Sequence, residues 1–249
     1  MGLELNNLVV PFKEAYGRVV DTMPGLIAEG RVPANTADVM RQRLESGLQD
    51  WKDNYFFLGD AIAYHPNGKF KVILDSPTLR ELTPKSNLKN GALILGDGLY
   101  ETLNGQEFSR SALTLDKDMT PADVKVHPVW QYVARDQKLL DAYVTKMFPE
   151  MKQRFGQGNT NYDNNMGVYL ENGDKKVPTL RALVVDGLEN WSGLNGSYNL
   201  VNDYGRLAGV APEALSALNT AIVKPSMTTL LGMINAELGK GNLEIRAKQ

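Results

Sequence analysis

Two stretches of the chain carry the same order of turn-forming residues, and this repetition constrains the fold more than any other feature. Leu180–Gly196 is an apolar run that ends in Asp186-Gly187-Leu188 and continues into a polar loop closed by Leu-Asn-Gly. Leu93–Gly105 has the same layout, with Asp97-Gly98-Leu99 and a second Leu-Asn-Gly. Asp-Gly and Asn-Gly pairs favour tight turns because these residues tolerate positive φ. Both stretches therefore predict strands that end in turns.

The elements around these stretches are similar enough to suggest an internal duplication. The first half offers a helix over 36–52 and an Asn-Gly hairpin over 61–75, and the second offers a helix over 128–155 and a hairpin over 167–185. Chance recurrence of common turn pairs explains the pattern more simply. Both alternatives stay open: two similar, pseudo-symmetric lobes over 1–125 and 126–249, or one domain, which 249 residues also permit.

The fold class predicted from these patterns is α+β, with antiparallel hairpins packed against helices. Asn67-Gly68 and Asn172-Gly173, each between apolar runs, predict the two hairpins. Apolar stripes predict a helix over Val9–Gly30 and another from Pro128, which Pro149 should break or kink. The remaining predicted elements are a helix start at Thr120-Pro121, helices over 212–218 and 227–238, and a strand over 243–246.

Composition excludes several classes of function. The chain has no Cys, so disulfides, thiolate metal ligands and a cysteine nucleophile are ruled out. A formal net charge of −2 argues against nucleic acid or an anionic membrane as partner. The N-terminus has no signal-peptide pattern and no apolar run is long enough to span a bilayer, so we expect a cytoplasmic protein without a membrane partner.

The sequence favours a protein that is not an enzyme and holds no cofactor. It lacks the phosphate-binding loop, the dinucleotide-binding glycines, the nucleophile elbow of hydrolases and the zinc-protease motif. The alternative is a metal-dependent hydrolase or phosphoryl-transfer enzyme that binds Mg²⁺ or Mn²⁺ through acids at strand ends, since hard cations prefer oxygen ligands. Its candidate ligands are Asp60, His65, Asp75, Asp97 and Asp186.

Two loops rich in Asn and Gly, Gly156–Gly167 and Glu189–Tyr204, are the better candidates for function, because exposed loops on a rigid scaffold commonly carry binding. The second loop combines flat aromatic faces with amide groups, a mixture that suits a protein partner, a peptide or a sugar. Its candidate binding residues are Trp191, Tyr198, Tyr204, Asn190 and Asn195.

The sequence therefore predicts a non-enzymatic binding or assembly protein whose loops contact a protein partner, a second copy of the chain or a small ligand. Aromatic loop residues also fold back onto their own core, and the sequence does not separate these roles. If Trp191 contacts a partner, its replacement by Ala should abolish binding and leave thermal stability nearly unchanged.

Overall fold

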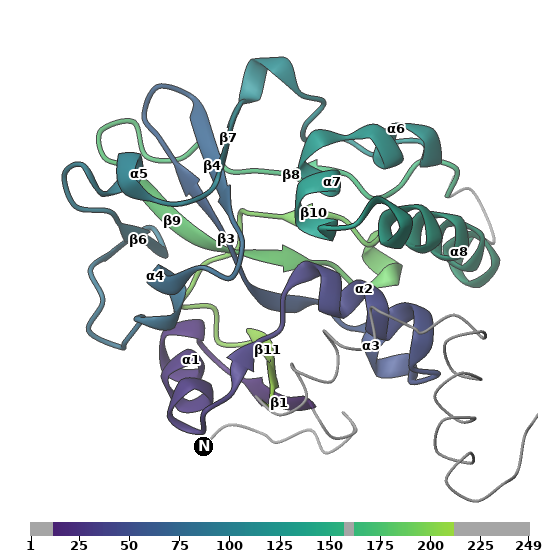
Figure 1. Ribbon diagram of the computed structural model, residues 1–249, viewed down its shortest axis with the longest axis horizontal. Coiled ribbons are helices and arrows are strands. Elements are labelled where there is room, and N and C mark those ends of the chain that lie inside the picture. The colour runs from purple at the N-terminus through teal and green to yellow at the C-terminus, as the bar shows by residue number, and fades with distance from the viewer. Residues whose placement is uncertain (1–11, 157–161, 212–249) are drawn as a thin grey trace, which may run out of the picture. The chain divides into compact units, whose positions relative to one another are not determined.

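A nine-residue strand, β3 (Phe56–Tyr64), forms the centre of the structure, and all of its residues are buried. The computed structural model describes residues 12–156 and 162–211. β3 pairs antiparallel with β9 (Thr179–Val185) on one side and with β4 (Lys69–Ile73) on the other (Figure 1). Most residues of β3 and β9 are apolar, with Asp60 and Arg181 as the charged exceptions, and such strands are expected to be covered on both faces.

The first predicted hairpin is confirmed. Gly68 has a φ of 84°, which glycine adopts without strain, and the His65 N–H donates to the Lys69 carbonyl at 2.9 Å. The Asn67 side chain accepts the N–H of Lys69 at 3.0 Å, so the turn residues supply their own hydrogen bonds. β4 continues the sheet by pairing with β7 (Gln106–Ser109).

The predicted helix from Val9 is wrong in its first part. β1 (Phe12–Tyr16) is a strand that pairs antiparallel with β11 (Arg206–Val210), a segment for which the sequence predicts no strand. Gly17, with a φ of 139°, then turns the chain into α1 (Val19–Ala28). A helical stripe of apolar residues cannot reveal a strand whose only hydrogen-bonding partner is distant in the sequence.

The second predicted helix starts where expected and ends early. α2 (Thr36–Glu45) begins with a capping box in which the Asn35 side chain accepts the Asp38 N–H at 3.0 Å and the Asp38 carboxylate accepts the Asn35 N–H at 3.1 Å. A separate helix, α3 (Gln49–Asp53), follows the poor helix former Gly47.

The helical segment after residue 120 also divides. α6 (Pro121–Val126) begins with the predicted Thr cap, because the Thr120 hydroxyl accepts the Asp123 N–H at 3.2 Å. The predicted single helix from Pro128 is interrupted at Arg135, whose φ of 61° is left-handed. The two resulting helices are α7 (Pro128–Ala134) and α8 (Gln137–Phe155). Pro149 does not end α8, which contains it.

The second predicted hairpin is wrong, because another strand lies between its two arms. β8 (Val168–Tyr169) pairs in parallel with β10 (Leu194–Asn195), and β10 pairs antiparallel with β9. The sheet order is therefore β1-β11-β3-β9-β10-β8 along its main path. The short 3-10 helix η2 (Leu188–Asn190) lies between β9 and β10.

The remaining elements are short. The strand β6 lies in the apolar run before Asp97, where the sequence predicts a strand, and Gly98, with a φ of 71°, leads into a single helical turn, α5. The bounds of these short elements are β2 (Val32–Pro33), α4 (Pro77–Arg80), β5 (Leu88–Lys89), β6 (Ala92–Ile94), α5 (Leu99–Thr102) and the 3-10 helix η1 (Arg110–Ala112).

Pseudo-symmetric lobes are not confirmed. β3, from before the expected boundary at residue 125, pairs directly with β9, from after it, and the boundary itself falls within α6. The two repeated stretches also differ in structure, since β6 has three residues and the β9 run has seven. The α+β class is confirmed, with helices packed on one mixed sheet.

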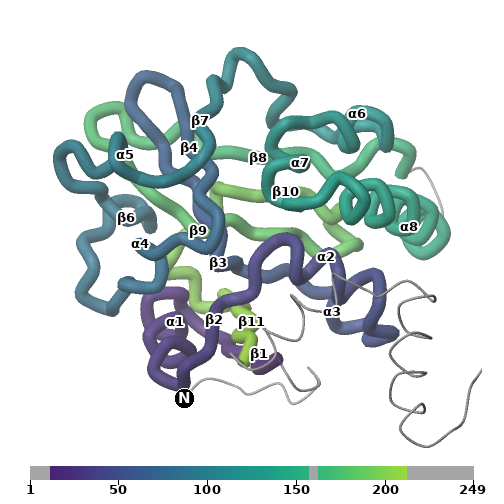
Figure 2. The backbone as a smooth tube through the Cα atoms, in the orientation of Figure 1, coloured from purple at the N-terminus to yellow at the C-terminus, as the bar shows by residue number. Residues whose placement is uncertain are grey.

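Four helices, α2, α6, α7 and α8, form one group beside the sheet. α8 packs against α2, α6 and α7, while α1 packs against β11 and β2 near the other end of the sheet (Figure 2). None of the helices in residues 12–156 and 162–211 has the length and apolarity required to cross a membrane. The helices predicted over 212–218 and 227–238 and the strand over 243–246 lie outside the described residues.

One buried arginine joins these elements. Arg43 of α2 is 1% exposed, and its guanidinium donates to three carbonyls and two hydroxyls, which match its five N–H groups in number. The acceptors are the carbonyls of Trp51, Asn54 and Asp186 and the hydroxyls of Tyr143 and Ser192, at 2.7 to 3.0 Å. Arg43 thereby connects α2 with α3, α8, the end of β9 and the β9–β10 segment.

Arg43→Met should lower the free energy of unfolding by about 3–5 kcal/mol, because several buried acceptors lose their donor. Arg43→Lys should be nearly as damaging, since an ammonium has three N–H groups and no planar fork. Urea denaturation measures both. The matched control is Arg41→Met on the same helix, whose partly exposed ion pair with Asp38 should contribute about 1 kcal/mol or less. Equal midpoints for the Arg43 and Arg41 variants would contradict the proposed role of Arg43.

Candidate functional site

Four tyrosines from separate parts of the chain gather at one place, and we call them the tyrosine cluster: Tyr16, Tyr55, Tyr198 and Tyr204. Tyr16 ends β1, Tyr55 precedes β3, and the other two lie between β10 and β11. The rings of Tyr55 and Tyr198 stack with centroids 5.8 Å apart and an interplanar angle of 12°. The Tyr55 hydroxyl donates to the Tyr204 carbonyl.

The cluster is polar at its surface and apolar beneath. Phe57 of β3 packs edge-on under Tyr198, with ring centroids 5.8 Å apart. Tyr204 is 56% exposed and Tyr55 is half-buried. The cluster therefore extends from the core to the protein surface. Arg206 lies over the Tyr16 ring at 5.8 Å and pairs with the buried Glu14 at 2.9 Å, which adds a cation beside the aromatic faces.

A buried carboxyl lies beside the cluster. Asp186, at the end of β9, is 6% exposed, and its Oδ1 has no hydrogen-bond partner among the described residues. Burial raises the pKa of Asp186 from 3.8 to about 7, although the Arg43 charge and side-chain hydrogen bonding with Asn195 and Tyr198 act to lower it. Burial also raises the pKa of Tyr198 to about 12, and the negative charge of Asp186 adds to that rise.

The predicted binding residues divide between two places. Tyr198 and Tyr204 belong to the tyrosine cluster, and Asn195 shapes the adjoining turn because its side chain accepts the N–H of Ser197 at 2.9 Å. Asn190 is exposed at the end of η2. Trp191 follows it in the left-handed region, with a φ of 62° and a half-buried side chain.

Trp191 joins the two predicted loops to each other. The Met166 N–H donates to the Trp191 carbonyl at 2.9 Å, and the Tyr162 ring packs edge-on against the indole with centroids 6.4 Å apart. The indole Nε1 of Trp191 is buried without a hydrogen-bond partner among the described residues. Trp191 therefore contributes to packing between the loops, whatever else it contacts.

Two of the five candidate metal ligands come together, around an arginine. Asp60 of β3 is fully buried and pairs with Arg135 at 2.8 Å, and Asp75 pairs with the same guanidinium at 2.7 Å. The second oxygen of Asp60 accepts the N–H and hydroxyl of Thr36 at 2.9 and 2.7 Å. Burial raises the pKa of Asp60, and the Arg135 charge opposes that rise. These oxygens stabilise α2, the β4–α4 turn and Arg135.

The other three candidate ligands lie elsewhere. His65 contacts the Tyr100 ring and lies 3.8 Å from Glu101, Asp97 is exposed beside α5, and Asp186 lies beside the tyrosine cluster. No group of three or more His, Asp or Glu side chains suited to a metal ion occurs within residues 12–156 and 162–211. The described carboxylates thus do not converge on one cleft.

Sequence reasoning missed Tyr16, Tyr55 and Arg206. Tyr16 falls in the helix predicted over Val9–Gly30, and Tyr55 precedes the hairpin predicted over 61–75. Their proximity depends on β1 and β11 closing beside β3, a long-range pairing with no local signal. A strand prediction for residues 206–210 would have been the one clue.

No protein-family model matches the sequence, and no curated protein matches it. The structure is similar to that of a protein from Nanoarchaeota in which the C-type lectin fold accommodates massive sequence variation. The TM-score is 0.58 at 17% identity, with 82% of this chain and 100% of that chain covered. A likeness at this identity shows the fold alone, which is the C-type lectin fold.

Asp186 should make stability depend on pH. Because folding raises its pKa, the folded protein keeps this proton where the unfolded chain has lost it, so this stabilisation is complete below about pH 4 and is lost as pH rises through about 7. Asp186→Asn should remove that slope and, above about pH 7, raise the free energy of unfolding by about 1–3 kcal/mol. Urea denaturation at several pH values measures this.

The matched control is Asp97→Asn, which makes the same charge change at an exposed position. It should leave the slope as it is in the unmodified protein. A slope that persists in Asp186→Asn would show that another group titrates.

Proposed function

We propose that this chain is a non-enzymatic binding protein that uses the tyrosine cluster and the adjoining Glu189–Tyr204 loop to bind a protein partner. The observation that carries the proposal is the gathering of four tyrosines from three segments at one site, with Tyr204 56% exposed. The fold supports it, because the sheet strands β9, β10 and β11 anchor the Glu189–Tyr204 loop.

The chemistry of the cluster suits a protein surface. Tyrosine offers a large flat apolar face and a hydroxyl while losing little conformational entropy, which explains its enrichment at binding hot spots. Arg206 beside Tyr16 adds a cation, and the exposed Asn190, in the segment between β9 and β10, offers an amide. Such a surface combines apolar contact with directional hydrogen bonds.

The Gly156–Gly167 loop adds a second segment to the proposed binding surface. Tyr162 and Met166, in the described part of Gly156–Gly167, contact Trp191, so the two Asn/Gly-rich segments support each other. In the nanoarchaeal protein the fold accommodates massive sequence variation. We infer that loops on this scaffold likewise tolerate changes of side chain that alter what they bind, with self-assembly as the special case in which the partner is a second copy.

Tyr204→Ala should weaken partner binding about tenfold or more, as for an aromatic hot spot, and change the free energy of unfolding by less than about 0.5 kcal/mol. Peptides selected from a random library against the whole chain serve as the probe, with affinity measured by calorimetry. Val126→Ala, at an exposed apolar residue of α6, is the control and should bind like the unmodified protein.

Trp191→Ala gives a different expected pattern. Because its indole is half-buried against Tyr162, the substitution should reduce stability by about 1–3 kcal/mol, in contrast with the nearly unchanged stability expected from sequence. Equal affinities of Tyr204→Ala and Val126→Ala for the selected peptides would contradict the proposed surface. Sedimentation of the chain alone tests self-assembly.

A further inference from the structure

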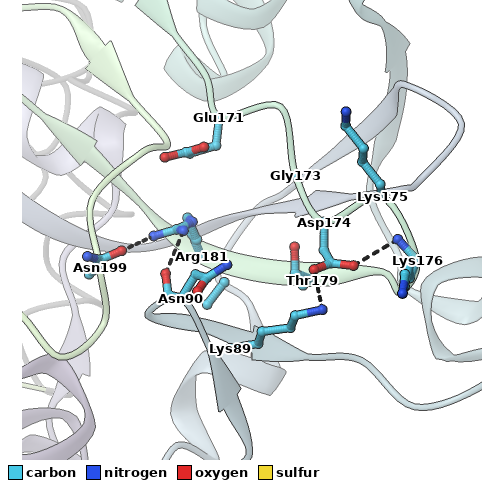
Figure 3. Close-up of a pocket in the computed structure, with 11 residues that line it drawn as sticks. Lys89, Asn90, Glu171, Gly173, Asp174, Lys175, Lys176, Thr179, Arg181 and Asn199 are labelled. Carbon is cyan, nitrogen blue, oxygen red and sulfur yellow. Dashed lines mark hydrogen bonds and ion pairs between the residues drawn. The ribbon is translucent and has the colours of Figure 1, made fainter.

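A polar pocket of about 650 Å³ opens beside Arg181 and Asn199 (Figure 3). Its walls are the start of β9, the β5–β6 turn and the segment between β8 and β9. Four basic and two acidic side chains line it, so its formal charge is positive. They are Lys89, Lys175, Lys176 and Arg181, with Glu171 and Asp174.

Arg181 is the buried charge of this pocket. It is 6% exposed, and Figure 3 shows its guanidinium between Asn90 and Asn199. Nη1 donates to the carbonyls of Ser197 and Tyr198 at 3.1 Å each and to the Asn199 side-chain oxygen at 2.5 Å, and Nη2 donates to the Asn90 carbonyl at 2.8 Å. All four acceptors are neutral oxygens, and a guanidinium has five N–H groups.

The acidic side chains leave this cation uncompensated. Asp174 pairs with Lys89 at 2.6 Å and accepts the backbone N–H of Lys176, which lowers the pKa of Asp174 to about 2. Glu171 is exposed, and no ion pair within 4 Å joins its carboxylate to Arg181. Its negative charge acts only at longer range, where it opposes the lowering of the Arg181 pKa by burial. Among the described residues, Arg181 therefore has no carboxylate partner, although buried charges are usually paired.

The walls of the pocket are fixed by backbone geometry. Asn90 and Gly91 have φ values of 51° and 71°, and a Cβ on Gly91 would lie 2.4 Å from the Asn199 side chain. Gly173 has a φ of 70°, and a Cβ there would lie 2.8 Å from the buried Tyr64. The positive-φ backbone at Asn90-Gly91 and at Gly173 thus holds the opposite walls close to Arg181.

We propose that this pocket binds a small molecule through an oxyanion, a carboxylate or a phosphate, that pairs with the Arg181 guanidinium. A planar, buried guanidinium with neutral neighbours recognises such a group through charge-assisted hydrogen bonds. Lys175 and Lys176 at the entrance attract the anion, while the amides of Asn90 and Asn199 and the hydroxyl of Thr179 are available to the polar remainder of the ligand. This site is separate from the proposed protein-binding surface.

Calorimetric titration of the whole chain with inorganic phosphate and with glucuronate, at constant ionic strength in chloride, tests the proposal and separates the two sources of oxyanion. Saturable binding of either probe is expected. Arg181→Gln should weaken it about tenfold or more, as for loss of a charge-assisted hydrogen bond. Glu171→Gln should strengthen it about threefold, because a repelling charge is removed from the lining.

Arg181→Gln also removes four structural hydrogen bonds, so a loss of binding in this variant does not separate binding from folding. Glu171→Gln leaves those hydrogen bonds in place and therefore tests binding alone. Lys176→Gln should weaken binding, and Lys138→Gln on α8, the control, should not change it. Tyr204→Ala should bind both probes normally, which distinguishes this site from the tyrosine cluster. Absence of saturable binding, or equal affinities of the Glu171, Lys176 and Lys138 variants, would overturn the proposal.

Discussion

The hydrogen bonds of Arg43 are the interaction on which the rest of the structure depends. A fully buried guanidinium is costly unless every N–H group finds an acceptor, and here five acceptors come from four separate parts of the chain. The acceptors include the Asp186 carbonyl, so the same interaction fixes the end of β9 where the tyrosine cluster begins. The charge of Arg43 also opposes the rise in the pKa of the Asp186 carboxyl that burial causes.

Three arginines, of which Arg43 and Arg181 are buried and Arg135 has a 26% exposed side chain, show three ways to satisfy a guanidinium. Arg43 is satisfied by neutral carbonyls and hydroxyls, and it stabilises the packing of helices on the sheet. Arg135 is paired with Asp60 and Asp75, so acids that resemble metal ligands in the sequence serve as its counterions. Arg181 has neutral acceptors but borders a cavity, and that difference makes it a candidate for binding rather than for packing.

The tyrosine cluster depends on the pairing of β1 with β11, the first and last strands of the described residues. β1 and β11 pair with each other, and β11 pairs with β3, which brings Tyr16 and Arg206 beside Tyr55. The Ser197–Asn199 segment then separates two environments: the Tyr198 ring stacks on Tyr55, and the Tyr198 carbonyl faces Arg181. A short segment of irregular backbone thus contributes to both candidate binding sites.

The sequence by itself determined the local structure. Adjacent residues specify the Asn67-Gly68 hairpin and the helix starts at Thr120 and Thr36, because each depends on hydrogen bonds within a few residues. The sequence also found Tyr198 and Tyr204, through their setting in a loop rich in Asn and Gly. Only the tertiary structure decided that residues 12–16 are a strand, that β10 separates β8 from β9, and that Asp60 and Asp75 hold Arg135. These features depend on partners far apart in the chain, for which adjacent residues carry no signal.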